Sequence, residues 1–214
     1  NEKTKRTTIN RKPQRAHYDQ KTIYSIIDSG LICHISYIHE GEPRIIPTAF
    51  ARIDNELFIH GSRVAGNMKV LATGIMASIC ITHLDGLVLA RSGFNHSMNY
   101  RSVIIYGSGN IVDDEKEKSA LLNKFTDYII PGRSKDGLKP ISKQDINATT
   151  LIRYQLNEMS AKIRTGHPID DEEDYKLRVW AGVIPISRQF GEPITDPKMR
   201  HSIPIPNYVK NYEK

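Results

Sequence analysis

The chain has 214 residues, enough to bury a sizeable core, and its 39% hydrophobic and 25% charged residues lie near globular averages, which excludes wholesale disorder. Lysine and arginine outnumber the acids by 30 to 24, but much of this excess falls in residues 3–21. Two cysteines without a CxxC motif, and no apolar run of about 18 residues, exclude a disulfide framework and a membrane-spanning helix, so we expect a cytoplasmic protein.

The sequence predicts three consecutive segments: a basic arm (1–16), one folded domain (17–186) and an extended tail (187–214). The arm is interpreted as a solvated tail, because no aromatic cluster accompanies its cations, and nucleic acid is therefore not an expected partner. The tail carries four prolines and is expected to lie on the surface or on a partner subunit without regular structure.

An amphipathic helix opens the domain. Asp19 is placed to cap its start, and Gly30 is expected to close it in a left-handed conformation. Its buried face is predicted to consist of Ile23, Ile26 and Ile27. Three strands in an antiparallel meander should follow, at residues 31–39, 43–53 and 57–60.

A second helix is predicted over residues 63–72, directly after Ser62. The free N–H groups at such a helix start, with Arg63 beside them, would suit a phosphate. Ser62 could equally serve as a cap and nothing more.

The middle of the chain predicts a hairpin, a long strand and a helix. Asp85 and Gly86 are expected to turn the chain between strands at 75–84 and 87–92. The strand at 102–112 contains Gly107 and Gly109, which are typical of bulges or bends. Asp113 or Asp114 should cap a helix to Tyr128, whose buried stripe is Leu121, Leu122, Phe125 and Ile129.

Strands are also predicted at 149–163 and 177–186, separated by a run of five acids within 167–174. That run lacks the spacing and glycine of a calcium loop, so a solvated loop is preferred to a cation site. Seven or so strands without regular strand–helix alternation indicate a mainly β fold, an antiparallel barrel with peripheral helices.

Three side chains are candidates for chemistry, each with a structural alternative. His60 closes a strand and could donate a hydrogen bond or transfer a proton, or be a strand-end histidine. Arg101 could pair with a phosphate or form a surface salt bridge. Trp180 could stack on a planar ring or simply pack.

Several motifs in order resemble the pyridoxamine 5'-phosphate oxidase-like flavoproteins, and in particular their nitroimidazole-resistance (Nim-type), flavin-nucleotide-binding branch. The resemblance covers roughly residues 13–186. The motifs are IIPTAF (45–50), LFIHGS (57–62), DGLVLARS (85–92), NYRSVIIYG (99–107), PGR (131–133), SAKIRTG (160–166) and WAGVIP (180–185).

The resemblance implies a split β-barrel homodimer with FMN between the subunits. It implies that His60 is the residue tied to chemistry at the flavin, and that Lys162 and Trp180 reach the cofactor from the partner subunit. The other implied FMN contacts are Pro47, Thr48, Ala49, Phe50, Gly61, Ser62, Arg63, Asn67, Tyr100, Arg101 and Ser102. Residues after Ile186 do not match the oxidase's substrate-binding segment, so vitamin B6 oxidation is not expected.

These observations lead to the hypothesis of an FMN-dependent oxidoreductase that passes electrons to a small organic acceptor, with a nitroaromatic as one candidate. The alternative is a non-catalytic protein that stores or senses flavin or a related cofactor, such as heme or a deazaflavin. No metal site is expected.

Overall fold

The computed structural model describes residues 3–214, and its contacts divide them into two compact units, each built from segments distant in sequence. The first, which we call the large-sheet unit, comprises residues 3–47, 77–107 and 156–188. The second, the small-sheet unit, comprises residues 48–76, 108–155 and 189–214. The division into arm, domain and tail stays a prediction.

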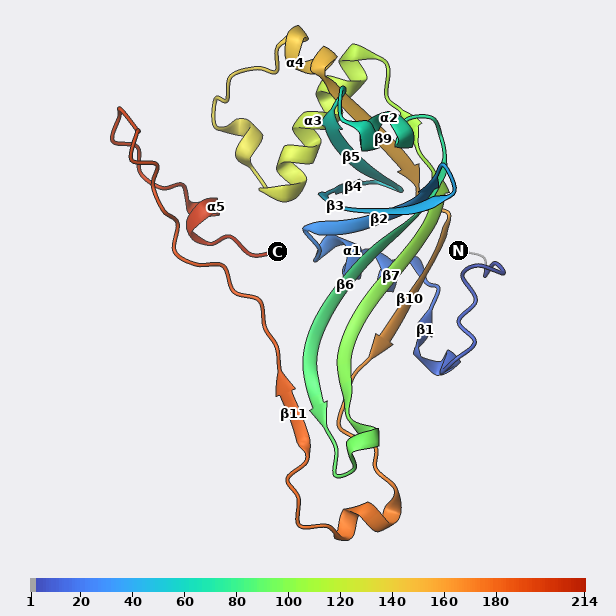
Figure 1. Cartoon of the computed structure of the whole chain (residues 1–214). Helices are drawn as coiled ribbons and strands as arrows, with labels where there is room; N and C mark the ends of the chain where they lie inside the picture. The colour runs from blue at the N-terminus through green and yellow to red at the C-terminus, as the bar shows by residue number, and fades with distance from the viewer. Residues whose placement is uncertain (1–2) are drawn as a thin grey trace. The chain divides into compact units, whose positions relative to one another are not determined.

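The large-sheet unit is built on seven strands in the order β1-β10-β7-β6-β2-β3, with β11 paired to β6. Figure 1 shows β6 and β7 as two long neighbouring strands of this sheet. Antiparallel pairings join β10 to β1 and β7, and β6 to β2 and β11. The strands are β1 (Ala16–His17), β2 (Ile32–His39), β3 (Glu42–Ala49), β6 (Met76–Leu89), β7 (Ser97–Ser108), β10 (Glu158–Arg164) and β11 (Gly182–Pro185).

The small-sheet unit holds four strands in the order β4-β5-β9-β8, all antiparallel. They are β4 (Ala51–Ile53), β5 (Glu56–Ser62), β8 (Asn110–Ile111) and β9 (Thr149–Gln155). Four helices belong to this unit: α2 (Gly66–Leu71), α3 (Glu115–Ile129), α4 (Lys143–Ala148) and α5 (Asn207–Lys210). Its core cluster consists of Ala51, Phe58, Val112, Phe125 and Leu151.

Helix α1 (Gln20–Asp28) and helix α3 begin where the sequence predicts. The Asp19 carboxylate accepts a hydrogen bond from the Thr22 N–H at 2.8 Å, and Asp114 accepts one from Glu117 at 2.7 Å. Such caps satisfy N–H groups that have no partner within the helix. The predicted apolar faces of both helices are also confirmed, since the α1 isoleucines are buried and the α3 stripe packs in the small-sheet core.

The short 3₁₀ segments complete the secondary structure. They are η1 (Pro13–Arg15), η2 (Gly93–Asn95), η3 (Arg133–Lys135) and η4 (Glu172–Lys176). Within residues 3–214, no helix is both long and apolar enough to cross a membrane.

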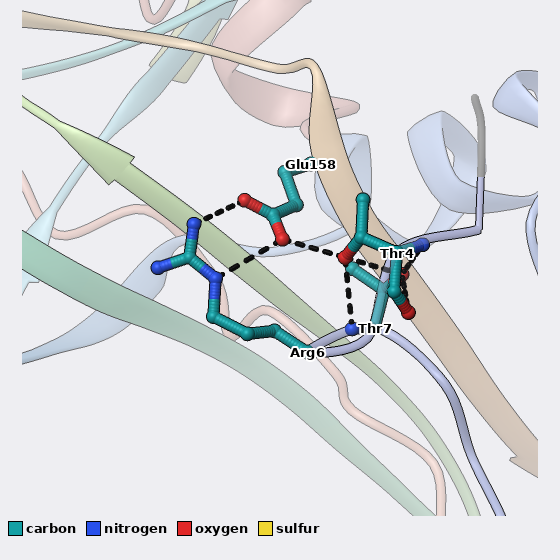
Figure 2. Close-up of polar contacts among 4 residues, drawn as sticks. All are labelled: Thr4, Arg6, Thr7 and Glu158. Atoms are coloured by element: carbon teal, nitrogen blue, oxygen red, sulfur yellow. Dashed lines mark hydrogen bonds and ion pairs between the residues drawn. The ribbon is translucent and has the colours of Figure 1, made fainter.

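Part of the basic arm, from Thr4 to Thr7, is held against β10 and is not solvated as its composition predicted, whereas residues 10–14 are exposed and residues 1–2 lie outside the described residues. Figure 2 shows Thr4 and Arg6 converging on the carboxylate of Glu158. The Thr4 hydroxyl donates at 2.6 Å, the Arg6 Nε donates at 3.1 Å, and Thr7 is only 1% exposed. The hydrogen bonds from Arg6 and then Thr4 hold the pKa of Glu158 below its usual value. Because these donors converge on one carboxylate, this segment has a defined place on the sheet.

The predicted Asp85–Gly86 hairpin is wrong, because β6 runs unbroken through both residues and the chain turns later, at η2. The Asp85 carboxylate is bound by Arg101 of β7, so it is not available for a turn. A Cβ on Gly86 would lie 3.0 Å from the Ile184 carbonyl oxygen. This glycine therefore admits the neighbouring strand β11 instead of bending the chain.

Other predicted boundaries also differ. The predicted strand at 149–163 is two strands, β9 and β10, and each belongs to a different sheet. The expected three-strand meander is divided in the same way, since β2 and β3 lie in the large sheet while β4 and β5 pair in the small one. Gly30 does not adopt a positive φ, and the tail includes the short helix α5. The predicted class, a mainly antiparallel β fold with few helices, is confirmed and is consistent with a split barrel.

Candidate functional site

The junction of β5 and α2 differs from the predicted phosphate cradle. Helix α2 begins at Gly66 with Ala65 as its N-cap, and Ser62 does not cap it. Residues 62–65 instead form a turn in which the Ala65 N–H donates to the Ser62 carbonyl at 3.0 Å. The Arg63 N–H donates to the Ala148 carbonyl at 2.8 Å, so this N–H is not available to a ligand, whereas the Arg63 side chain is exposed.

Gly61 lets β5 approach α2 closely. A Cβ at this position would lie 2.8 Å from Cγ of Met68, which is a buried residue on the helix. Contacts this short force side chains to shift, so glycine preserves the spacing between strand and helix. Asn67 precedes Met68 in the first turn of α2.

His60 lies on the solvent-accessible side of β5, opposite Leu151 of β9. Its ring packs edge-on against Phe125 of α3, with ring centroids 4.7 Å apart. Although His60 is exposed as a whole, its ring loses water where it packs against Phe125, and this desolvation lowers the pKa of His60 and favours the neutral imidazole. Within the described residues the ring makes no hydrogen bond, which leaves both nitrogens available to a ligand.

The lowered pKa of His60 predicts a specific dependence of stability on pH. The pKa of His60 is about 6.5 in the unfolded chain and lower in the folded protein, so between these two values the unfolded chain binds a proton more readily. The free energy of unfolding therefore falls as the pH drops through that window. We expect the urea midpoint of the natural protein to fall more steeply between about pH 7 and 5.5 than that of His60→Gln. The exposed His201→Gln variant should keep the steeper fall, and equal slopes in all three proteins would contradict the account.

Residues 47–50 cross from the end of β3 to the start of β4. Strand β3 is at the edge of the large sheet, so alternate backbone groups along it have no strand partner. Pro47 and Ala49 are exposed and Thr48 is half-buried, but Phe50 is fully buried, with its ring 6.1 Å from that of Tyr128. Any contact of Phe50 with a ligand would therefore involve its backbone.

Tyr100 and Ser102 lie on one face of the large sheet, opposite Arg164 and Lys162 respectively in the β7–β10 register. The Ser102 hydroxyl donates to the Lys162 carbonyl at 3.3 Å. Arg101 points to the other face, because neighbouring residues of a strand alternate. There its Nε and Nη2 each donate to the Asp85 carboxylate at 2.9 Å. The salt-bridge alternative for Arg101 is thus the one observed.

Trp180 precedes β11 and is 67% exposed. A Cβ on Gly182 would lie 2.8 Å from Cζ2 of the indole, so the ring folds over this glycine. Most of this large aromatic side chain is nevertheless accessible to solvent, and such a surface is well suited to a partner.

Two further residues, Asp170 and Arg164 of the large-sheet unit, were not singled out from the sequence. Asp170, within the acidic run, is buried and accepts hydrogen bonds from the Arg91 and Ser92 N–H groups. The solvated-loop prediction is therefore wrong for this one acid. Within residues 3–214, no cluster of His, Cys, Asp or Glu could hold a metal ion.

Arg164 is the second residue that was not singled out from the sequence. It lies on the same sheet face as Lys162, and the spacing of two residues between them along the strand could have indicated this.

The sequence model of the family described as pyridoxamine 5'-phosphate oxidase matches residues 19–163, more than half of the chain. The chain belongs to the pyridoxamine 5'-phosphate oxidase family. No curated protein matches it. The predicted membership of this family is therefore confirmed.

Solved structures similar to this member of the pyridoxamine 5'-phosphate oxidase family include two at more than 30% identity. The flavocytochrome Anf3 from Azotobacter vinelandii is 37% identical over 96% of this chain and 95% of its own, with a TM-score of 0.91. The FAD and heme binding protein from Mycobacterium smegmatis is 31% identical over 91% of this chain and 95% of its own, with a TM-score of 0.87.

A 5-nitroimidazole antibiotic resistance protein from Bacteroides thetaiotaomicron is also similar in structure. It is 21% identical over 69% of this chain and 86% of its own, with a TM-score of 0.58. At this identity the likeness extends to the fold alone.

Proposed function

We propose that this protein binds a flavin nucleotide and passes electrons through it to a small organic acceptor. The observation that carries the proposal is 37% identity, over 96% of the chain, to a protein described as a flavocytochrome, together with membership of the pyridoxamine 5'-phosphate oxidase family. A bound flavin supplies the redox chemistry, while the protein binds it, orients it and sets its electrostatic surroundings.

Several of the residues from β3 to α2 suit a flavin. The open backbone edge at residues 47–50 offers N–H and carbonyl groups to the polar edge of an isoalloxazine ring. The exposed guanidinium of Arg63 can pair with a phosphate, and the Asn67 amide lies one turn further along. His60, neutral and without a hydrogen-bond partner among residues 3–214, can accept or donate one hydrogen bond at the ring.

Residues of the large-sheet unit are proposed as further contacts. Tyr100, Ser102 and Lys162 share one face and present a phenol, a hydroxyl and an ammonium group. Arg101 would have to exchange Asp85 for a ligand, so we assign phosphate binding to Arg63. FMN is our first choice of flavin, and FAD is the alternative, because one relative is described as an FAD and heme binding protein.

We also propose that the protein is a homodimer in which Trp180 and Lys162 contact the flavin of the partner. The exposure of the Trp180 side chain supports this proposal. Light scattering of the purified protein should give twice the 24.3 kDa mass of one chain, and Trp180→Ala should weaken flavin binding. A monomer that binds flavin at full strength would exclude a site shared between subunits.

Heme binding is a second candidate function, because both relatives above 30% identity have descriptions that include a cytochrome or heme. Neutral imidazole is a common ligand of iron, and His60 is the histidine kept neutral without a protein hydrogen bond. A Soret band that persists in His60→Ala would remove His60 from this role.

A turnover assay distinguishes an enzyme from a protein that only stores or senses flavin. The flavin-loaded protein should bleach near 450 nm when NADH or NADPH is added without oxygen, and should regain colour when a nitroaromatic or oxygen is admitted. We expect His60→Ala to slow this cycle while flavin remains bound. A protein that binds flavin but is not reduced by either nucleotide would support the storage or sensing alternative instead.

A further inference from the structure

A cavity of about 420 Å³ in the large-sheet unit lies where β10 ends and the N-terminal segment passes. This volume falls within the roughly 300–1,000 Å³ typical of small-molecule pockets. The polar part of its lining consists of Gln14, Arg15, His17, Arg164 and Thr165. All five side chains can donate hydrogen bonds, and none is an acid.

Arg164 is the least accessible of these residues, at 5% exposed. Its Nη1 donates to the Asn99 side-chain oxygen and, at 3.3 Å, to the Gly166 carbonyl, while Nη2 donates to the His167 carbonyl at 3.2 Å. Its Nε is buried and has no hydrogen-bond partner among the described residues. Every acceptor is neutral, so the hydrogen bonds orient the guanidinium without neutralising its charge.

Several other arginines of this unit pair with a carboxylate. Arg6 pairs with Glu158, Arg91 with Asp170 and Arg101 with Asp85. In the part of the chain that the structure describes, neither Arg15 nor Arg164 forms an ion pair.

The cavity also brings like charges together. Burial and then the nearby charge of Arg15 lower the pKa of Arg164. The carboxylate of Asp19, four residues after Arg15 in the sequence, already accepts the hydrogen bond that caps α1. Two unpaired guanidinium groups at one cavity cost free energy that a bound anion would offset.

We propose that this cavity binds a phosphate group. Arginine matches phosphate geometry through paired N–H donors, and Arg15, His17 and Thr165 can reach the ligand while Arg164 supplies fixed charge. The volume admits either the free anion or a phosphate ester with its organic part. This site shares no residue with the proposed flavin contacts, and Arg164 lies opposite one of them, Tyr100, in the β7–β10 register.

Calorimetric titration of the full chain, at constant ionic strength and with or without saturating FMN, tests the proposal. We expect saturable binding of inorganic phosphate in both cases, and about tenfold weaker binding in Arg15→Gln. Thr165→Ala should also weaken binding, and offers a second variant outside the buried part of the site. The matched control is Arg11→Gln, an exposed arginine on the same segment, which should bind as the natural protein does.

Adenosine 5'-monophosphate distinguishes the two sources of the phosphate. Binding about tenfold tighter than inorganic phosphate would indicate an ester, and equal binding would indicate the free anion; both support the site. The proposal is overturned by absence of saturable binding, by equal weakening in Arg11→Gln and Arg15→Gln, or by loss of phosphate binding when FMN is bound. A protein that binds phosphate but no flavin would contradict the proposed function and leave this site standing.

Discussion

Replacing Phe58 with alanine is expected to lower the free energy of unfolding by about 3–5 kcal/mol. Phe58 is 0% exposed at the centre of β5 and packs with Ala51, Val112, Phe125 and Leu151. Removing its ring leaves a cavity that the two strands on either side of β5 cannot easily fill, since both are held by antiparallel pairing. Urea denaturation followed by circular dichroism measures the loss.

Phe94→Ala is the matched control for this prediction. Phe94 is 96% exposed in η2, so its removal should change stability by no more than about 0.5 kcal/mol. A loss in Phe58→Ala below about 1 kcal/mol, or one equal to that of Phe94→Ala, would contradict the packing of the small-sheet core. Because Phe125 also supports the ring of His60, Phe58→Ala should weaken ligand binding near β5 as well.

Replacing Asp170 with alanine should release the segment that follows β10. Its carboxylate accepts hydrogen bonds from the Arg91 N–H at 3.1 Å and the Ser92 N–H at 3.4 Å, and it pairs with the Arg91 guanidinium at 3.2 Å. Burial opposes ionisation, but the hydrogen bonds from Arg91 and Ser92 keep the pKa of Asp170 below its usual value. Without this acceptor the two N–H groups and one guanidinium lose their partner together.

We expect the amides of Arg91 and Ser92 to exchange hydrogen at least about tenfold faster in Asp170→Ala. Trypsin should also cleave sooner near Lys176. Asp171→Ala removes an exposed acid from the same run and should leave exchange and cleavage unchanged. Equal amide exchange rates in Asp170→Ala and Asp171→Ala would mean that Asp170 is exposed to solvent like the other acids of the run, as the sequence alone predicted.

Periodic features were predictable from the sequence, because they depend on neighbours a few residues away. The isoleucine face of α1 and the Asp114 cap of α3 are of this kind. The Asp85–Gly86 pair was misread since its role depends on Arg101 and β11, which only the folded sheet brings to it. The division of 149–163 into two strands could not be predicted for a related reason: apolar and polar residues alternate through both halves, and only the folded chain assigns them to different sheets.

The candidate site shows the same limit. The position of His60 at an accessible place on a strand could be predicted, but its support by Phe125 of α3 could not. Ser62 was a candidate cap for α2, and the structure gives that place to Ala65, whose side chain offers no hydrogen bond. The family resemblance carried more of the functional hypothesis than local spacing did, because the motifs lie far apart in the chain and only their order is distinctive.

The central claim is that this chain binds a flavin, and equilibrium titration tests it most directly. The purified protein, freed of any cofactor, would be added to FMN and, separately, to FAD while flavin fluorescence is followed. We predict saturable quenching with one flavin per chain for at least one of the two, weakened by Arg63→Gln and kept by the control Arg11→Gln. Fluorescence that stays unchanged with both flavins up to millimolar protein, in a chain that remains folded, would contradict the account.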